Sequence, residues 1–345
     1  MTGVIGLDVG GVSTKGAWAP DDRGLRGRTA SRAFEVWRER ERDALAAVIA
    51  GVVENLGAGH AHAVALTMTA ELSDAFRTKR MGVAFVLDAA QHALGAMPLR
   101  VFTTGGELID PDAARRRPLD VAASNWVATA QWVAGAREAA LLIDVGSTTA
   151  DIIPIVGGQV AATGWTDLDR LLSGELIYTG ALRTNLAAVA QQVPVRGGWC
   201  PVAAELFAIS ADVHVVLGHL APSAYTCPTP DGRDTSPARA RERIARLVCA
   251  DAEQLRPEEI DAIARHLHDA QVAQIAAAAS RVGAGVPPEA PIVGAGAGVF
   301  LVREVAARIG RELAGLPGGW DVAAAEVAPA VALAELLRRE AGPTC

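Results

Sequence analysis

A two-lobed α/β fold is predicted for this chain by three features of its sequence. An Asp followed by Gly and small hydroxyl residues occurs at residues 8–14 and again at residues 144–149. Segments with strand character alternate with segments with helical character, which is typical of the α/β class. A Gly-rich turn, residues 294–298, lies between a short apolar run and a helical pattern near the C-terminus. With 345 residues, the chain is long enough for two lobes of ordinary size.

The elements are expected in a definite order along the chain. Each Asp-Gly turn follows a short β-rich run and leads into a second apolar run, so each predicts a hairpin, and two such hairpins predict two lobes built on one plan. Residues 183–199 are expected to form a connector, and residues 227–237, rich in Pro, Thr, Asp and Gly, a loop. Further strands are expected at residues 63–69, 99–103 and 291–293, and helices at residues 42–53, 125–133, 236–250, 257–281, 299–309 and 328–339.

The first lobe is expected to span residues 1–138 and the second residues 139–345, with the C-terminal helix either in the second lobe or packed back on the first. Half of the residues are hydrophobic and 21% are charged, which is the composition of a globular protein. Trp126 and Trp132 lie six residues apart on an expected helix, and both side chains are expected to pack in the protein core.

Composition and charge exclude several classes of partner. The net charge is −7, so counterion release would not favour binding to nucleic acid. No apolar run approaches the roughly 20 residues that a membrane span needs, and the N-terminus has no basic region followed by an apolar run, so neither a membrane partner nor a signal peptide is predicted. The four cysteines form no CxxC pair, which favours a reducing compartment. We therefore expect a cytoplasmic protein.

The two Asp-Gly turns carry residue types that suit a phosphorylated ligand. Asp8 and Asp144 are expected to hold Mg²⁺, directly or through water, because hard cations take oxygen ligands. Glycine permits positive φ, so that backbone N–H groups can converge on a phosphate without an intervening Cβ. An ordinary hairpin turn is the alternative for either segment alone. The predicted phosphate-binding residues are Gly10, Gly11, Ser13, Thr14, Lys15, Gly146, Ser147, Thr148 and Thr149.

The late Gly-rich turn has two interpretations. Its glycines, Gly294, Gly296 and Gly298, have GxGxG spacing and not the GxGxxG of a dinucleotide fingerprint. One interpretation is that the turn passes beneath a nucleotide base or ribose, with the following helix N-terminus directed at the ligand. The other is that small residues are needed there only for close packing of a helix on a strand.

These three elements in this order resemble the phosphate-1, phosphate-2 and adenosine motifs of the actin, heat-shock ATPase and sugar-kinase superfamily. That resemblance implies a two-lobed actin-like ATPase (ribonuclease H-like) fold, with duplicated sheet-and-helix domains around a cleft. Residues 67–76, with Lys79 and residues 82–83, resemble the signature of the hydantoinase/oxoprolinase branch, although Ala70 stands where Gly is usual. Residues 123–126 and 231–234 extend the resemblance, over nearly the whole chain, to the methanofuran-biosynthesis enzymes linked to tetrahydromethanopterin C1 transfer.

The resemblance implies an Mg²⁺-dependent transferase. In that family an aminomethyl-furanylmethyl diphosphate is joined to the phenol of a γ-glutamyl-tyramine or tyrosine-type acceptor, which forms an ether and releases diphosphate. The partners are then a phosphorylated small molecule and a phenolic acceptor. Whether the protein forms a homodimer is left undecided by the resemblance. One alternative is an ATP-dependent kinase or a hydantoinase/oxoprolinase-type amidohydrolase, because ATP and a diphosphate ester fit the same turns. A nucleotide-gated regulator or scaffold is the alternative of another class.

A phenol with a free pKa of about 10 needs a nearby base. Glu71 and Asp74 are the candidates because they follow an expected strand end, and the alternative is a solvated helix N-terminus. Lys79 is expected either to contact a phosphate or carboxylate or to lie on the surface. The family motifs also mark Asn125, Asp231 and Arg233 as ligand-binding.

The histidines are not expected to bind metal. His60/His62 and His266/His268 are HxH pairs, whose members point to different faces of a helix and rarely suffice in a loop. His214 and His219 lie in an apolar run and are expected to be core or cleft residues.

Overall fold

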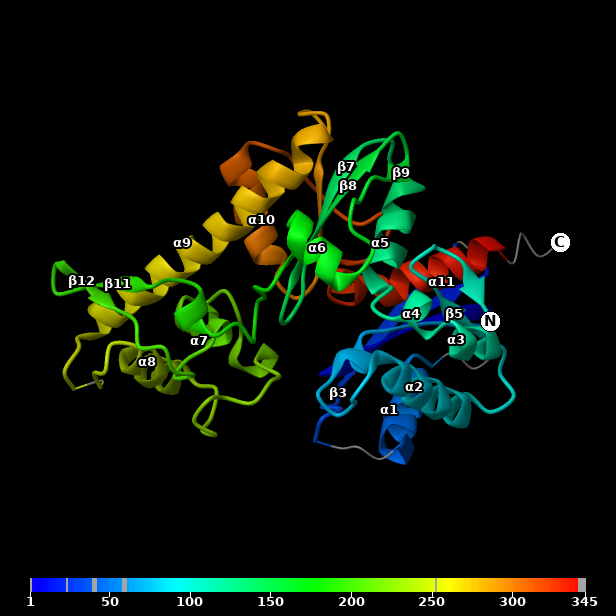
Figure 1. Cartoon of the computed structure of the whole chain (residues 1–345), viewed down its shortest axis with the longest axis horizontal. Helices are drawn as coiled ribbons and strands as arrows, with labels where there is room; N and C mark the ends of the chain where they lie inside the picture. The colour runs from blue at the N-terminus through cyan, green and yellow to red at the C-terminus, as the bar shows by residue number, and fades with distance from the viewer. Residues whose placement is uncertain (1, 23, 39–41, 58–60, 252, 341–345) are drawn as a thin grey trace. The chain divides into compact units, whose positions relative to one another are not determined.

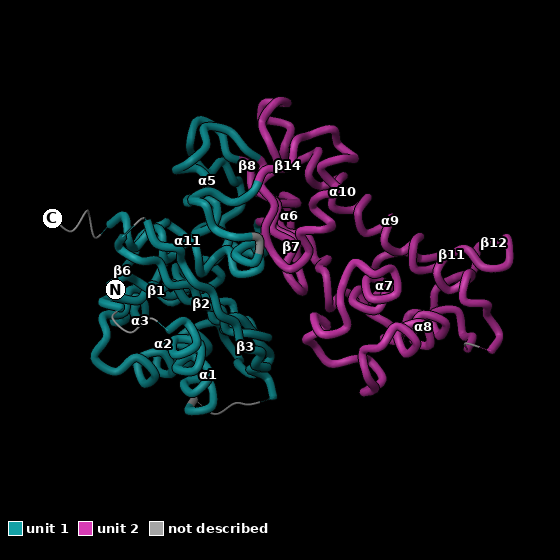
Figure 2. The backbone as a smooth tube through the Cα atoms, turned by 180° about the vertical axis from the view of Figure 1, so that it is seen from behind, with its two compact units in different colours: residues 1–140, 155–169, 315–345 teal, residues 141–154, 170–314 magenta. Residues whose placement is uncertain are grey.

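The computed structural model describes residues 2–22, 24–38, 42–57, 61–251 and 253–340 (Figure 1). These residues form two compact units, coloured separately in Figure 2. Unit 1 comprises residues 1–140, 155–169 and 315–345, and unit 2 comprises residues 141–154 and 170–314. The chain enters unit 2 at residue 141 and returns to unit 1 twice, at residues 155–169 and 315–345. The single boundary predicted at residue 138 therefore does not describe the division.

A six-stranded mixed sheet forms the centre of unit 1. Its order is β3-β2-β1-β4-β5-β6, in which β1, β2 and β3 are antiparallel neighbours, β4 and β5 run parallel to β1, and β6 is antiparallel to β5. All seven residues of β1 are buried, as expected for a central strand covered on both faces. The strands are β1 (Gly3–Val9), β2 (Ser13–Pro20), β3 (Arg28–Ala33), β4 (Ala61–Met68), β5 (Leu99–Phe102) and β6 (Leu108–Ile109).

Helices cover the sheet of unit 1. Side chains of α1 and α2, such as Leu45 and Leu87, share a core with Leu7 and Leu66 of the sheet. The C-terminal helix α11 packs on β1, where Gly6 allows the approach because a Cβ there would overlap the carbonyl of residue 330. The helices are α1 (Arg42–Asn55), α2 (Lys79–Leu94), α3 (Pro111–Arg116), α4 (Pro118–Val121), α5 (Asn125–Ala134) and α11 (Ala328–Glu340), with 3-10 turns η1 (Ala70–Leu72) and η5 (Val322–Val327).

Unit 2 holds most of the second mixed sheet, of order β10-β8-β7-β13-β14. Residues 155–156, at the end of β8, and the β9 strand paired with them belong to unit 1. Strand β13 runs parallel to both β7 and β14, and β10 is antiparallel to β8. The strands are β7 (Ala140–Val145), β8 (Ala150–Val156), β9 (Gln159–Val160), β10 (Leu176–Ile177), β13 (Ile292–Ala295) and β14 (Leu313–Ala314).

A second, mainly helical part of unit 2 has its own core, which includes Val213, Ile244 and Ile263 from α7, α8 and α9. Residues 183–199, expected to be a connector, instead contain most of the hairpin of β11 and β12, whose turn places Arg196 and Gly197 at positive φ. The helices are α6 (Asp167–Ser173), α7 (Ser210–Val216), α8 (Pro237–Arg246), α9 (Pro257–Val282) and α10 (Val299–Ile309), with 3-10 turns η2 (Leu186–Ala188), η3 (Pro222–Ala224) and η4 (Gly283–Gly285), and strands β11 (Gln192–Val195) and β12 (Gly198–Pro201).

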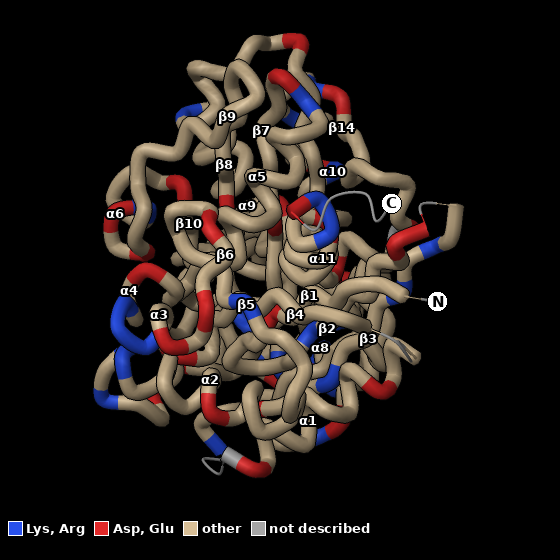
Figure 3. The backbone as a smooth tube through the Cα atoms, turned by 90° about the vertical axis from the view of Figure 1, so that its right-hand side faces the viewer, with Lys and Arg blue, Asp and Glu red and all other residues tan. Residues whose placement is uncertain are grey.

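Surface charge and helix hydropathy bear on the expected partners. Acidic and basic residues are interspersed along the chain, with a net charge of −7 (Figure 3). Among the described residues, no helix combines the length and the apolar character that crossing a membrane requires.

Trp126 and Trp132 are both buried on α5, which confirms their predicted place in the core.

Candidate active site

The two Asp-Gly turns have the same backbone hydrogen bond. Between β1 and β2, the N–H of Gly10 donates to the carbonyl of Ser13 over 2.9 Å. Between β7 and β8, the N–H of Gly146 donates to the carbonyl of Thr149, also over 2.9 Å. The repeat predicted from the sequence is therefore a repeat of structure, with one copy in each unit.

The glycines of these turns do not adopt the conformation expected for them. Neither Gly10, Gly11 nor Gly146 has a positive φ, so the predicted left-handed geometry is wrong. What their lack of a side chain provides is space. A Cβ on Gly11 would meet no protein atom within 4 Å, so the first turn presents uncovered backbone there. Such backbone can approach an anionic ligand closely.

Asp8 of β1 is buried, with only 5% of its surface exposed. Its Oδ1 atom has no hydrogen-bond partner within the described residues. Burial raises the pKa of this carboxyl, and the Lys15 ammonium opposes that effect. Lys15 and Thr67 are the residues paired with Asp8 on the two neighbouring strands, so all three share one face of the sheet. A buried carboxylate oxygen without a partner is a suitable ligand for a cation.

The hydroxyl residues of the first turn do not all belong to this face. Thr14 is paired with Val9 across β1 and β2 and therefore lies on the face opposite to Asp8. Its hydroxyl is fully buried and has no hydrogen-bond partner among the described residues. Ser13, at the start of β2, is half-buried, as is Lys15.

The second turn is supported by a segment that the sequence analysis did not single out. The N–H of Ala181 donates to Gly146 (2.9 Å), and those of Leu182 and Arg183 donate to Ser147 (3.0 and 2.9 Å). Gly180 lies so close to this turn that a Cβ on it would be 2.5 Å from the Thr148 nitrogen. The backbone carbonyls of Gly146 and Ser147 therefore both accept hydrogen bonds from this segment. Asp144, Ser147, Thr148 and Thr149 are half-buried, and the hydroxyls of Ser147 and Thr148 are 3.4 Å apart.

The late Gly-rich turn packs against the strand that carries Asp144. Gly296 has φ +87°, and a Cβ on it would overlap the carbonyl of Val145 and the Asp144 side chain. The N–H of Gly298 donates to the carbonyl of Val145 over 2.8 Å. A Cβ on Gly294 would lie 3.1–3.3 Å from three aliphatic side chains. Close packing therefore accounts for all three glycines, and contact with a nucleotide stays a prediction.

Two glycine variants should separate structural need from ligand access. Gly296→Ala is expected to destabilise unit 2 by about 2 kcal/mol or more, because the substitution adds a clash to a positive φ. Gly11→Ala should change the free energy of unfolding by less than about 0.5 kcal/mol, because its Cβ meets open space. Urea unfolding of the two variants measures both values. Equal destabilisation by the two substitutions would contradict the assignment of Gly296 to close packing and of Gly11 to ligand access.

Glu71 is a buried carboxyl of unit 1 with a strongly raised pKa. It lies in η1, directly after β4, and only 1% of it is exposed. Neither of its carboxylate oxygens has a hydrogen-bond partner among the described residues. Burial raises its pKa from 4.5 to about 8, although the backbone amides of Glu71 and Ala123 and the Lys79 ammonium act in the opposite direction. A buried carboxyl that titrates near neutrality is suited to proton transfer.

The other residues of this signature are placed differently. Lys79, at the start of α2, forms an ion pair with Asp167, at 3.0 Å between Nζ and Oδ2. Asp167 lies 88 residues further along the chain and carries no local signal of its role. Asp74 is exposed, in the turn after η1. Glu71 and Asp74, proposed together from the sequence, thus have opposite environments.

The segment before α5 is hydrogen-bonded to β4, the strand beside Asp8. Ser124 and Thr67 are hydrogen-bonded through their hydroxyls at 2.8 Å, and Thr67 is the strand neighbour of Asp8. Ala123 has φ +51°, which is unusual for a residue with a side chain. Strain of this kind often occurs at functional sites. Asn125, predicted to bind ligand, is half-buried at the first position of α5.

Asp231 and Arg233 are engaged within unit 2. Asp231 accepts hydrogen bonds from Nη1 of Arg243 (3.0 Å) and from the N–H of Arg233 (3.1 Å). Although partial burial opposes it, these two donors hold the pKa of Asp231 below its ordinary value. Arg243 is itself buried and paired with buried Asp212 at 2.8 Å. The contacts explain how this loop is anchored, and a role in binding ligand stays a prediction.

A protein-family model and named relatives match the sequence of this chain. Residues 62–340 match the model of the hydantoinase/oxoprolinase family. The chain is 36% identical, over 77% of its length and 77% of the relative's, to a (4-{4-[2-(gamma-L-glutamylamino)ethyl]phenoxymethyl}furan-2-yl)methanamine synthase of Methanocaldococcus jannaschii. It is 40% identical to the same synthase of Methanococcus vannielii over 34% of its length and 53% of the relative's.

A solved structure supports the fold class. Nucleotide-free acetone carboxylase, from a study of ATP-dependent acetone carboxylation, superposes with a TM-score of 0.53 at 10% identity, over 96% of this chain and 70% of that one. This likeness concerns the fold alone. With its paired Asp-Gly hairpins, the chain has an α/β fold of the actin-like ATPase class. By the extent of its sequence match, the chain belongs to the hydantoinase/oxoprolinase family and, within it, to the group of these methanamine synthases.

Proposed function

We propose that this chain is a transferase of methanofuran-type cofactor biosynthesis that forms an aryl ether. The name of its relative describes a product in which a phenol oxygen is joined to the methylene group of a furan ring. The phenol carries a γ-glutamylaminoethyl group, which identifies the acceptor as a γ-glutamyl-tyramine. The proposed donor is an aminomethyl-furanylmethyl diphosphate, because diphosphate is a good leaving group and the Asp-Gly turns suit phosphates.

The observation that carries this proposal is the buried carboxyl of Glu71, whose pKa is raised to about 8. A phenol has a free pKa of about 10, so a base of this strength can accept its proton during attack. In the proposed step, the phenol oxygen forms a bond to the methylene carbon and its proton passes to Glu71. The bond between that carbon and the diphosphate breaks, and its electron pair leaves with the diphosphate.

Mg²⁺ is proposed as the counter-ion of the diphosphate. The unpartnered Oδ1 of Asp8 is a hard oxygen ligand of the type that Mg²⁺ prefers, so the residues present fit this ion. Asp144 is the corresponding carboxylate in unit 2. When bound, Mg²⁺ would neutralise charge that develops on the leaving group. Lys15, on the same face as Asp8, would add a positive charge.

The identity of the phosphate product tests the proposed reaction. Purified protein is incubated with Mg²⁺, a γ-glutamyl-tyramine acceptor and either the furanylmethyl diphosphate or ATP, and the products are read by mass spectrometry. Ether and diphosphate are expected with the first donor, and no acceptor-dependent ADP with the second. Robust ADP formation would instead favour the kinase or amidohydrolase alternative, which the fold also accommodates.

Ligand-induced stabilisation tests the phosphate site independently of turnover. Diphosphate with Mg²⁺ is expected to raise the melting temperature, because a ligand that binds only the native state stabilises it by mass action. Omission of Mg²⁺ should abolish the shift. Gly11→Ala should reduce the shift while leaving the melting temperature of the free protein unchanged. No shift at saturating diphosphate would contradict a phosphate site.

A further inference from the structure

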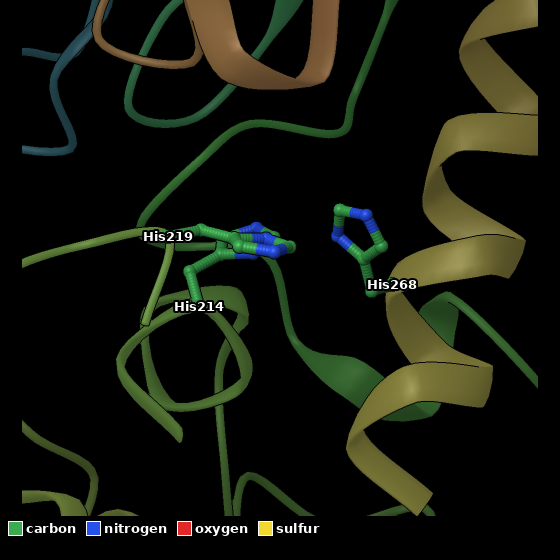
Figure 4. Close-up of side chains that lie close together, drawn as sticks. All are labelled: His214, His219 and His268. Atoms are coloured by element: carbon green, nitrogen blue, oxygen red, sulfur yellow. The ribbon is translucent and has the colours of Figure 1, made fainter. Parts of the chain in front are cut away.

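Three histidines that the sequence analysis assigned to the core or to separate pairs converge in unit 2. His214 lies on α7, His219 in the turn that follows it, and His268 on α9 (Figure 4). One ring nitrogen from each lies within 4.8 Å of those of the other two. The rings of His214 and His219 are stacked, and that of His268 lies edge-on to both. No metal role was predicted for these histidines from the sequence, because they lie far apart in it or in an apolar run.

The two buried imidazoles each have one nitrogen held and one left free. Nε2 of His214 lies 3.1 Å from Oε1 of Gln271, and Nε2 of His268 lies 2.8 Å from Oε2 of Glu304 on α10. If these nitrogens donate, the Nδ1 atoms carry the lone pairs. Both Nδ1 atoms are buried and have no hydrogen-bond partner among the described residues. This is the arrangement of metal-bound histidines, whose second nitrogen donates to a carboxylate or carbonyl oxygen.

We propose that His214, His219 and His268 bind one divalent transition-metal ion of the zinc class. Imidazole nitrogens suit Zn²⁺ and its neighbours, whereas Mg²⁺ prefers oxygen ligands. Three protein ligands leave a fourth position for water or a ligand, as in zinc sites that bind small molecules. His219 is exposed, so the ion is reached from solvent at this residue.

Simple packing explains the cluster less well than a metal ion does. Phe300 contacts the rings of His214 and His219, at centroid distances of 4.8 and 5.6 Å, so the group also has apolar contacts. Packing alone leaves these two buried Nδ1 atoms without a hydrogen-bond partner among the described residues, which is energetically unfavourable.

The cluster is connected to the second Asp-Gly turn. Gln271, which holds His214, donates through Nε2 to Oγ1 of Thr179 (2.9 Å) and to the carbonyl of Gly180 (2.8 Å). Gly180 in turn packs against the backbone of Thr148. A bound ion would therefore order His214, Gln271 and the segment that supports the turn. The proposal does not depend on the reaction, because metal binding can be measured without substrate.

Metal titration of the full-length chain tests the proposal. Protein stripped with a chelator is titrated with Zn²⁺, and with Co²⁺ as a spectroscopic probe, and bound metal is counted by elemental analysis. One ion per chain is expected, with the visible spectrum of a nitrogen-ligated Co²⁺. His219→Ala should weaken the affinity at least 100-fold, whereas His266→Ala, on the same helix as His268 but facing Trp199, should bind like wild type.

Glu304→Gln provides a second test in case His219→Ala disturbs folding. Glu304→Gln, which changes only the hydrogen-bond partner of His268, is expected to weaken Zn²⁺ binding roughly 10- to 100-fold. Asp8→Asn, in unit 1, should not affect Zn²⁺ binding, and Mg²⁺ should not displace the ion. Substoichiometric binding by wild type, displacement by Mg²⁺, or wild-type affinity in both His219→Ala and Glu304→Gln would overturn the proposal.

Discussion

Asp8→Asn is expected to reduce turnover by roughly 10³-fold without weakening the fold. Loss of a metal-facing carboxylate costs several kcal/mol of transition-state stabilisation, and each 1.36 kcal/mol corresponds to a tenfold change in rate. Stability should not fall, because burial raises the pKa of Asp8 and the charged carboxylate therefore opposes folding. Turnover and the melting temperature, measured on the same preparation, check both halves of this prediction. Asp144→Asn is expected to reduce turnover in the same way.

A surface carboxylate provides the matched control. Asp120 has a side chain that is 44% exposed and paired with Arg117, so Asp120→Asn should leave turnover unchanged. Asp8→Asn should also lose the Mg²⁺-dependent melting shift with diphosphate. Near-wild-type turnover in Asp8→Asn would remove this residue from the site, even if the protein still bound phosphate.

Glu71→Gln is expected to reduce turnover by 10²- to 10⁴-fold, the usual contribution of a general base. In the wild type, the carboxylate form increases as the pH rises through the pKa of about 8, so turnover should rise over the same range. The variant should show no inflection near pH 8. A wild-type rate that falls through pH 8 would assign the protonated carboxyl as the active form and contradict the base role.

The same carboxyl should make stability depend on pH. The folded protein keeps the Glu71 proton up to about pH 8, whereas the unfolded chain releases it near pH 4.5. Unfolding is therefore increasingly favoured between these values, and wild type should lose up to roughly 5 kcal/mol relative to Glu71→Gln. Urea unfolding of both proteins at pH 5, 7 and about 9 measures the difference. Parallel stability curves would show that Glu71 does not titrate in this range.

Long helices were predictable because their signals are local. Residues 299–309, expected to be helical, form α10 (Val299–Ile309), and the helix expected at residues 257–281 ends one residue later, at Val282. Shorter elements were missed. The α7 helix has seven residues and is almost wholly buried, so its amphipathic pattern is absent. The hairpin of β11 and β12 turns on Arg196 and Gly197, of which Arg is not a usual residue at positive φ.

The sequence by itself determined the paired Asp-Gly hairpins and the family, because each rests on residues close together in the chain. Only the tertiary structure decided that Glu71 is buried while Asp74 is exposed, since burial depends on which segments cover η1. The pairing of Lys79 with Asp167 and the convergence of His214 with His268 join residues far apart in sequence. No local pattern encodes such contacts, because the packing of whole elements creates them.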